Sequence, residues 1–278
     1  MKNCLRAELW KATHNKMFYT TLLIGALIVA LNVWEVHGSM QSFLDRIMDE
    51  PYGVVKSAEG YSLFMEAMPF GVFGFSAELC YFIWPILATM PFAGSYLKEH
   101  REGISSQIIS RCNVGTYFFS KYMAIFITGG IAILFPTVLD VLLCALISPS
   151  YVPTVGMSGL DNRYFLAHLF YTHPWGYFAA WLPIIFIWGG VTAGLALVAG
   201  CRFRHTVFAL LLPYCLYFIF TAVQSVFFPA AATLSPMMMV RPTSSLPIYA
   251  SVLFGGAALV AVISLGVGYW QVKRNEKL

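Results

Sequence analysis

The chain carries very little charge for its length. Of its 278 residues, 59% are hydrophobic and only 11% are charged, whereas soluble domains carry about 25% charged residues. Several runs of about 20 apolar residues are long enough to cross ~30 Å of hydrocarbon as helices. Segments of about 10 residues with alternating polarity, which a membrane β-barrel needs, are missing. The composition therefore excludes an ordinary soluble domain and predicts an all-α polytopic membrane protein.

Motifs for catalysis, cofactors and metals are also missing. The sequence has no Gly-x4-Gly-Lys-Ser/Thr phosphate loop, no His-Glu-x2-His zinc motif and no Gly-x-Ser-x-Gly elbow. The six cysteines are scattered without a C-x-x-C pair, so neither a disulfide framework nor a zinc site is indicated. We therefore expect a chain that is not an enzyme, holds no metal or cofactor, and binds no nucleic acid.

Apolar runs are abundant, and they predict a single transmembrane domain over 1–278 with six helical spans. An amphipathic arm, 1–16, precedes the first of them, and the run that begins at Met17 is too long for a signal-peptide core. We predict spans at about 17–36, 76–96, 119–147, 175–199, 206–228 and 248–271.

The basic residues predict the orientation of these spans. With the N-terminus inside, the arm and the 97–121 loop would each place four Lys or Arg in the cytoplasm, the turn near residue 203 two and the C-terminal tail three. That makes thirteen of the 17 basic residues. Because cytoplasmic loops carry the excess of Lys and Arg, we predict a multi-pass cell-membrane protein with both termini in the cytoplasm.

Amphipathic segments outside the spans are predicted to lie along the membrane surface. In the arm, Leu5, Leu9 and Ala12 share one helical face, which favours an interfacial helix over a frayed basic tail. After the first span, apolar residues at helical spacing predict a separate surface helix, capped by Ser39 and stopped by Pro51. The 229–247 segment is apolar enough to form a broken re-entrant hairpin.

A few polar residues and glycines fall inside the predicted spans. Asn32, Glu35 and Gln224 occupy the outer thirds of the first and fifth spans, where they either share a wet surface or form interhelical hydrogen bonds. Asp140 either bonds to a neighbouring helix or relays protons. The pair Gly190-x3-Gly194 predicts close helix packing within the chain.

The segment 97–112 is the one charged stretch that is also typical of an ordered helix. Gly103 can take the left-handed geometry that ends one helix, and Ser105 can cap the next. The new helix would have only about two turns, with Ile104, Ile108 and Ile109 on an apolar ridge. Because such short helices are marginal in water, the ridge needs a surface to dock on, either a soluble partner protein or the membrane.

The region "PILATMPFAGSYLKEHREGISSQIISRCNVGTYFFSKYM" resembles the part of type 2 ATP-binding-cassette exporter permeases between the second and third spans. The resemblance consists of a span with Pro, Glu-x3-Gly, a short apolar helix, an Arg, an aromatic and a Lys, here Glu99, Gly103, Ile104–Ile109, Arg111, Tyr117 or Phe118, and Lys121. An amphipathic arm, six spans and cytoplasmic termini are also features of that family.

This resemblance implies the permease subunit of an ATP-driven exporter. The loop would contain the coupling helix, seated on a separately encoded ATPase that uses ATP and Mg. Two ATPase copies and a second permease chain, identical or related, would complete the unit in the membrane lipids. The implied ATPase-coupling residues are Glu99, Arg101, Glu102, Gly103, Ile104, Ser105, Ile108, Ile109 and Arg111.

The family also implies a pathway and a substrate class. Its first and fifth spans flank the central pathway, which favours Asn32, Glu35 and Gln224 as pathway residues. The expected substrate is amphipathic or hydrophobic: a peptide antibiotic, a lipid-like molecule or a drug. One alternative is a polytopic membrane enzyme or assembly factor with a site in the outer loops, around Asp161, His168 and His173. Another is an ion-coupled transporter that uses Asp140.

Overall fold

The computed structural model describes residues 2–49, 62–71, 74–153, 160, 163–203, 205–227, 235–243 and 248–275, and all regular structure in them is helical. In chain order the helices are α1 Lys2–Thr13, α2 Lys16–Asp49, α3 Leu63–Glu66, α4 Phe75–Thr89, α5 Ser95–Arg101, α6 Ile104–Arg111, α7 Val114–Cys144, α8 Ala167–Thr172, α9 Pro174–Arg202, α10 Thr206–Phe227, α11 Pro236–Met239 and α12 Ala250–Asn275.

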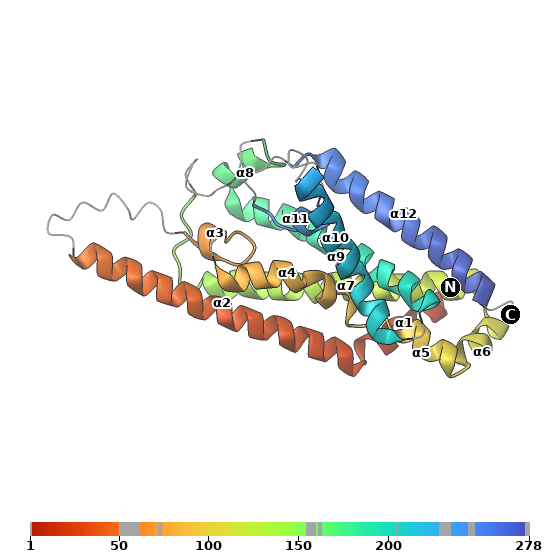
Figure 1. Ribbon diagram of the computed structural model, residues 1–278. Helices are drawn as coiled ribbons and strands as arrows, with labels where there is room; N and C mark the ends of the chain where they lie inside the picture. The colour runs from red at the N-terminus through yellow and green to blue at the C-terminus, as the bar shows by residue number, and fades with distance from the viewer. Residues whose placement is uncertain are drawn as a thin grey trace.

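Five of the helices in the described ranges are long and apolar enough to cross a membrane: α2, α7, α9, α10 and α12. They lie roughly side by side as an elongated bundle (Figure 1). The apolar stretch of α9 is 67% buried within the protein, against 17% for α10 and α12. The helix α9 is therefore the centre of the bundle, and α10 and α12 present most of their apolar surface outward, as in a multi-pass membrane protein.

The helices α7 and α9 pack closely because small residues line their seam. A Cβ on Gly129 would lie 2.4 Å from the Ala193 Cβ, so no larger residue fits there. On α9, Gly190 faces the Phe126 ring and Gly194 faces the Tyr122 ring, each closer than 3.0 Å to a hypothetical Cβ. The predicted packing role of Gly190 and Gly194 within one chain is confirmed.

The first span differs from the prediction, because α2 does not end near residue 36. It runs unbroken for 34 residues from Lys16 to Asp49, about 51 Å at 1.5 Å per residue and longer than the ~30 Å of a hydrocarbon core. The separate helix capped by Ser39 is therefore wrong. Gly38 lies in the middle of the helix, and the Ser42 hydroxyl donates to its carbonyl at 3.0 Å. Pro51 lies outside the described residues.

The second span also differs, since the predicted helix 76–96 is broken. The helix α4 has 15 residues and ends at Thr89, and α5 begins only at Ser95. Pro91 interrupts the helix because it has no N–H to donate, and its carbonyl accepts a hydrogen bond from the Asn15 amide at 2.9 Å. Gly94 then passes close to α10, where a Cβ would lie 2.5 Å from Thr206 Cγ2. Six long spans are therefore not present among the described helices.

The remaining predicted spans match helices whose ends shift by up to five residues. The largest shift is at the third span, predicted at 119–147, because α7 begins at Val114 and ends at Cys144. The Asn113 side chain caps it by accepting from the Gly115 N–H at 3.3 Å. This extra turn carries polar residues, which a hydropathy criterion leaves out of a span, and it places Lys121 well inside the helix.

Both termini lie at the same end of the bundle, together with α1, α5 and α6 (Figure 1). We call this the basic end, because it carries the Lys and Arg of α1, α5, α6 and the last turn of α12. The small helices α3 and α8 lie at the opposite, far end. The basic residues on which the predicted orientation depends are thus gathered at one end of the bundle.

At the far end, the segment 235–243 returns into the protein beside α9. The Trp181 indole donates to the Val240 carbonyl at 3.1 Å, and the Tyr177 hydroxyl donates to the Pro242 carbonyl. Trp181 is two turns into α9, about 10 Å from its start. Residues 235–243 of the predicted hairpin therefore pack against α9, and its flanks, 228–234 and 244–247, lie outside the described residues.

Candidate functional site

The basic end contains the candidate coupling segment, which is two short helices joined by a tight turn. The helix α5 ends at Arg101, and α6 begins at Ile104. Gly103 between them has a φ of +71°, the left-handed conformation that favours glycine. Its predicted role as the helix break is therefore confirmed.

The predicted cap of α6 is wrong. Gly103 occupies the N-cap position and makes no side-chain cap hydrogen bond. Ser105 lies one residue inside the helix, fully buried, with its hydroxyl 3.4 Å from His100 Nδ1. Gly103 turns the chain without a side-chain cap. Ser105 of α6 instead contacts His100 of α5 and so links the two short helices.

The apolar ridge of α6 docks partly on the protein itself. Ile108 and Ile109 are half-buried and pack against a core formed with α1 and α7. Ile104 is also half-buried. Arg101, Glu102 and Arg111, by contrast, are exposed. The surface that α6 offers to another molecule is therefore a charged rim beside a partly covered ridge, and not a free apolar face.

A buried ionic cluster lies behind this segment. The Lys121 ammonium of α7 donates to Glu99 Oε2 of α5 at 2.5 Å and to Glu8 Oε2 of α1 at 3.1 Å. The Lys11 ammonium donates to the other oxygens of the same two carboxylates, at 2.9 Å to Glu8 and 3.2 Å to Glu99. The Tyr117 hydroxyl donates to Glu99 Oε2 at 2.8 Å. Two cations and two anions thus balance one another.

Burial makes the pairing in this cluster obligatory. Lys121 is 1% exposed and Glu8 is 2% exposed, and an isolated charge in such a place is very costly. Burial alone would raise the pKa of Glu99, but the charge and hydrogen bond of Lys121, with the Tyr117 hydroxyl and Lys11, outweigh it and lower that pKa. For Lys11, burial is outweighed by the hydrogen bonds and charges of Glu8 and Glu99, which raise its pKa.

The cluster joins three elements that are far apart in the chain. It ties the arm α1 and the segment α5 to the same point on the long helix α7. A displacement of α5 must therefore move α7 or break buried ion pairs. Glu99 and Lys121 belong to the sequence pattern shared with exporter permeases, but Glu8 was not identified from the sequence. The only signal for it was a single acid in an otherwise basic arm.

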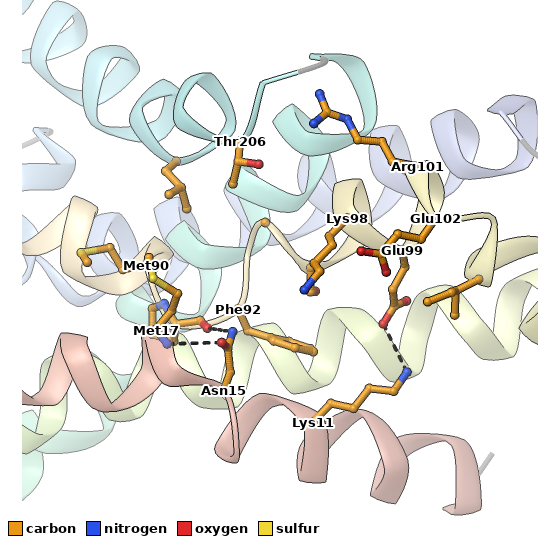
Figure 2. A pocket seen from close by; sticks show the side chains of 15 residues that line it. Lys11, Asn15, Met17, Met90, Phe92, Lys98, Glu99, Arg101, Glu102 and Thr206 are labelled. Carbon is orange, nitrogen blue, oxygen red and sulfur yellow. Dashed lines mark hydrogen bonds and ion pairs between the residues drawn. The ribbon is translucent and has the colours of Figure 1, made fainter.

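A pocket of about 700 Å³ opens beside the cluster at the basic end. Figure 2 shows its lining, with Asn15 and Met17 at the joint of α1 and α2, Met90 and Phe92 in the turn after α4, and Thr206 at the start of α10. The helix α5 forms the remaining wall. The pocket therefore lies where the turn after α4, the arm α1 and the start of α10 meet.

Two of the three predicted pathway residues meet at the far half of the bundle. The Asn32 amide donates to Asp140 Oδ1 at 2.8 Å, and the Ser76 hydroxyl lies 2.7 Å from Asn32 Oδ1 and 2.5 Å from Glu35 Oε2. The Met68 N–H donates to Asp140 Oδ2 at 2.6 Å. Asn32 and Asp140 are both buried. Of the alternatives given for each residue, the structure therefore shows the interhelical hydrogen bond.

Gln224, the third predicted pathway residue, is not part of that network. It is 6% exposed on α10, and neither its amide nitrogen nor its amide oxygen has a hydrogen-bond partner in the described structure. A buried amide without partners is uncommon in folded proteins. The structure therefore places Gln224 apart from Asn32 and Glu35.

The outer-loop alternative finds no cluster among the described residues. His168 and His173 are exposed, and Asp161 lies outside the described residues. The described ranges contain no group of three or more His, Cys, Asp or Glu side chains that could hold a metal ion.

Comparison of the chain with models of known protein families and with curated protein sequences found no match. The likeness to exporter permeases therefore depends on the segment 85–123 and on the architecture itself.

Proposed function

We propose that the chain is the transmembrane permease subunit of an ATP-driven exporter, coupled to a separate ATPase through α5 and α6. The observation that carries this proposal is the α5–α6 pair, which is bent at Gly103 and stands at the basic end between α4 and the long helix α7. Its exposed charges, Arg101, Glu102 and Arg111, suit a hydrophilic protein partner better than a membrane surface.

In this proposal α4 is the second of six spans. It has 15 residues, or about 22 Å of helix, and the turn at 90–94 would complete the depth of the membrane before α5 leaves it. The excess of Lys and Arg at the basic end supports a cytoplasmic location for both termini in the cell membrane.

The working unit would contain two ATPase subunits and two permease chains, identical or related. Closure of the ATPases on ATP would push α6 and α5. The ion pairs of Glu99 with Lys121 would then transmit the displacement to α7, because they join α5 to α7 without flexible chain between them. Glu99 is thus a positioning residue in the coupling, and Arg101, Glu102, Gly103 and Arg111 contact the partner.

The expected substrate is amphipathic or hydrophobic: a peptide antibiotic, a lipid-like molecule or a drug. Among the pathway candidates, Gln224 is favoured by its free amide and Glu35 by its half-buried position. Asn32 is engaged with Asp140 and would support the pathway wall. A Gln224→Ala variant should alter resistance to the substrate without altering ATPase binding, and unchanged resistance would argue for simple packing.

The coupling is tested by co-purification with an ATPase that contains a phosphate loop and is encoded beside this chain. The double variant Glu102→Arg/Arg111→Glu should insert into the membrane normally but lose the ATPase and its effect on ATP turnover. The matched control is Lys273→Glu/Arg274→Glu, which alters two exposed charges of α12 at the same end. Equal ATPase binding by both variants and the parent chain would overturn the proposal.

A further inference from the structure

The pocket at the basic end lies at the level of a membrane boundary. Two helices that can cross a membrane begin there, α2 at Lys16 and α10 at Thr206, and both contribute to the pocket through Met17 and Thr206. Its volume of about 700 Å³ is within the range of pockets that hold drug-sized molecules. A single small ion would leave most of that space unfilled.

The lining of the pocket is divided between apolar and polar residues. Met17, Met90, Phe92 and Leu210 form an apolar side, beside the start of the apolar surface of α10. On the side of α5, Lys98 points into the pocket and Arg101 lies at its rim (Figure 2). An occupant that satisfies both sides has an anionic head and an apolar tail.

The charges of the pocket are not balanced internally. Glu99 and Lys11 also line it, but their charges are matched within the buried cluster by Lys121 and Glu8. Lys98 and Arg101 are exposed and form no ion pair with a described residue. One acid, Glu102, lies beside them at the end of α5, so two cations and one anion are left and the free charge of the pocket is positive.

The start of α10 adds to this positive character. The first N–H groups of a helix have no acceptor within it, and the helix dipole favours an anion at that end. Thr206 provides the first of these N–H groups, together with an exposed side-chain hydroxyl. Lys98 of α5 and the start of α10 thus lie on two walls of one pocket (Figure 2).

We propose that this pocket binds the anionic phosphodiester headgroup of a membrane phospholipid from the adjacent leaflet. The phosphate lies between Lys98 and the start of α10, and the first part of an acyl chain lies against Met90 and Leu210. Basic pockets between helices on the cytoplasmic side commonly recognise anionic headgroups in this way. This proposal does not depend on the proposed transport function, since it requires only that the basic end stands at a membrane surface.

The test is lipid binding to the purified full chain in detergent, measured by native mass spectrometry without any ATPase. The probes are dioleoyl phosphatidylglycerol, dioleoyl phosphatidylcholine and free sn-glycerol 3-phosphate. We expect one phosphatidylglycerol to bind tightly, phosphatidylcholine at least tenfold more weakly, and glycerol phosphate not measurably. Lys98→Glu should weaken phosphatidylglycerol binding about tenfold or more, because it removes a basic residue near the headgroup and puts an acid in its place.

The matched control is Lys273→Glu, which makes the same change of charge at an exposed residue of α12 at the same end of the protein. It should leave phosphatidylglycerol binding within about twofold of the parent chain. Equal losses in both variants would show diffuse attraction to anionic lipid and overturn the proposal. Equal binding of the two lipids, or competition by glycerol phosphate at lipid concentrations, would overturn it too. Lys98 was not among the coupling contacts, so this variant separates the lipid site from ATPase docking.

Discussion

The long helix α7 carries two buried polar clusters that are built in opposite ways. At the basic end Lys121 and Lys11 each pair with the carboxylates of Glu8 and Glu99, so two positive charges balance two negative ones. At the far half Asp140 accepts hydrogen bonds from the Asn32 amide and the Met68 N–H, and no cation of the described structure pairs with it. The two residues are about 28 Å apart along the helix, close to one hydrocarbon thickness.

The difference shows how each region solves the cost of burying charge. Where separate helices must be held together, opposite charges give strong and mutually dependent links, and removal of one leaves the others without compensation. In the far cluster the donors are neutral, an amide of α2 and a backbone N–H, and each contributes on its own. Asp140 holds the backbone at Met68, which precedes α4, while Lys121 holds α1 and α5.

The largest expected effect is at the basic end. Lys121→Met would leave Glu8 and Glu99 buried with only the half-exposed Lys11 between them. We expect a loss of about 3–5 kcal/mol of unfolding free energy, measured by reversible unfolding in mixed micelles. Lys273→Met, at an exposed position of the same end, should change it by less than about 0.5 kcal/mol. A loss below about 1 kcal/mol in Lys121→Met would show that the cluster does not hold the helices together.

A smaller loss is expected in the far cluster. Asp140→Asn retains one carbonyl oxygen, so either the Asn32 amide or the Met68 N–H loses its acceptor. The expected loss is about 2 kcal/mol, with faster hydrogen exchange confined to the residues around Met68. Cys144→Ala, which removes only weak thiol contacts to the same carboxylate and to the Asn32 amide, is the control and should cost less. A loss as large as that of Lys121→Met would erase the contrast between the two clusters.

Between the two clusters, the glycine seam should respond to volume and not to charge. Gly129→Ala places a methyl group 2.4 Å from the Ala193 Cβ, and overpacking of this kind costs about 1–3 kcal/mol. Gly255→Ala on α12, where nothing lies within 4 Å of the new Cβ, should leave stability unchanged or slightly raised. Equal effects of the two substitutions in thermal unfolding would mean that α7 and α9 are not in close contact.

The smallest expected effect is the pH dependence of the basic end. Because the pKa of Glu99 is lowered below its ordinary value of 4.5, the contribution of this carboxylate to stability is present above that pH and is lost as the pH falls through the folded-state pKa. The pKa of Lys11 is raised above 10.5, so its contribution is lost only as the pH rises beyond that value. Glu99→Gln should flatten the acid part of a pH series of unfolding midpoints. If Glu99→Gln left the acid slope unaltered, the loss of stability in acid would come from other carboxylates.

Much of the architecture was predictable because it follows from composition and local geometry. The apolar runs predicted four of the five long helices, α7, α9, α10 and α12, to within about five residues at each end, since a helix long enough to cross a membrane needs little tertiary context. Gly103 was predictable as a break because a left-handed residue between two helical runs strongly favours glycine. The packing of Gly190 and Gly194 followed from their spacing on one helical face.

The errors arose where a contact from elsewhere in the chain changed a local preference. The break at Pro91 was missed because the surrounding run is apolar enough for a continuous span, yet the Asn15 amide and Thr206 of α10 meet the chain there. The continuation of α2 past residue 36 was missed because polar residues in a helix resemble a loop by hydropathy.

Hydrophobicity and the placement of basic residues depend on each residue alone, and they already define a bundle of apolar helices with one basic end. The partners of its polar residues depend on which helices become neighbours. Glu8 and Lys121 are 113 residues apart, and nothing local to either one indicates the other. Only the packing of α1 and α5 against α7 makes them an ion pair. The same packing fixes the charged segment at 97–112, which would be marginal as an isolated helix, to the core of the bundle.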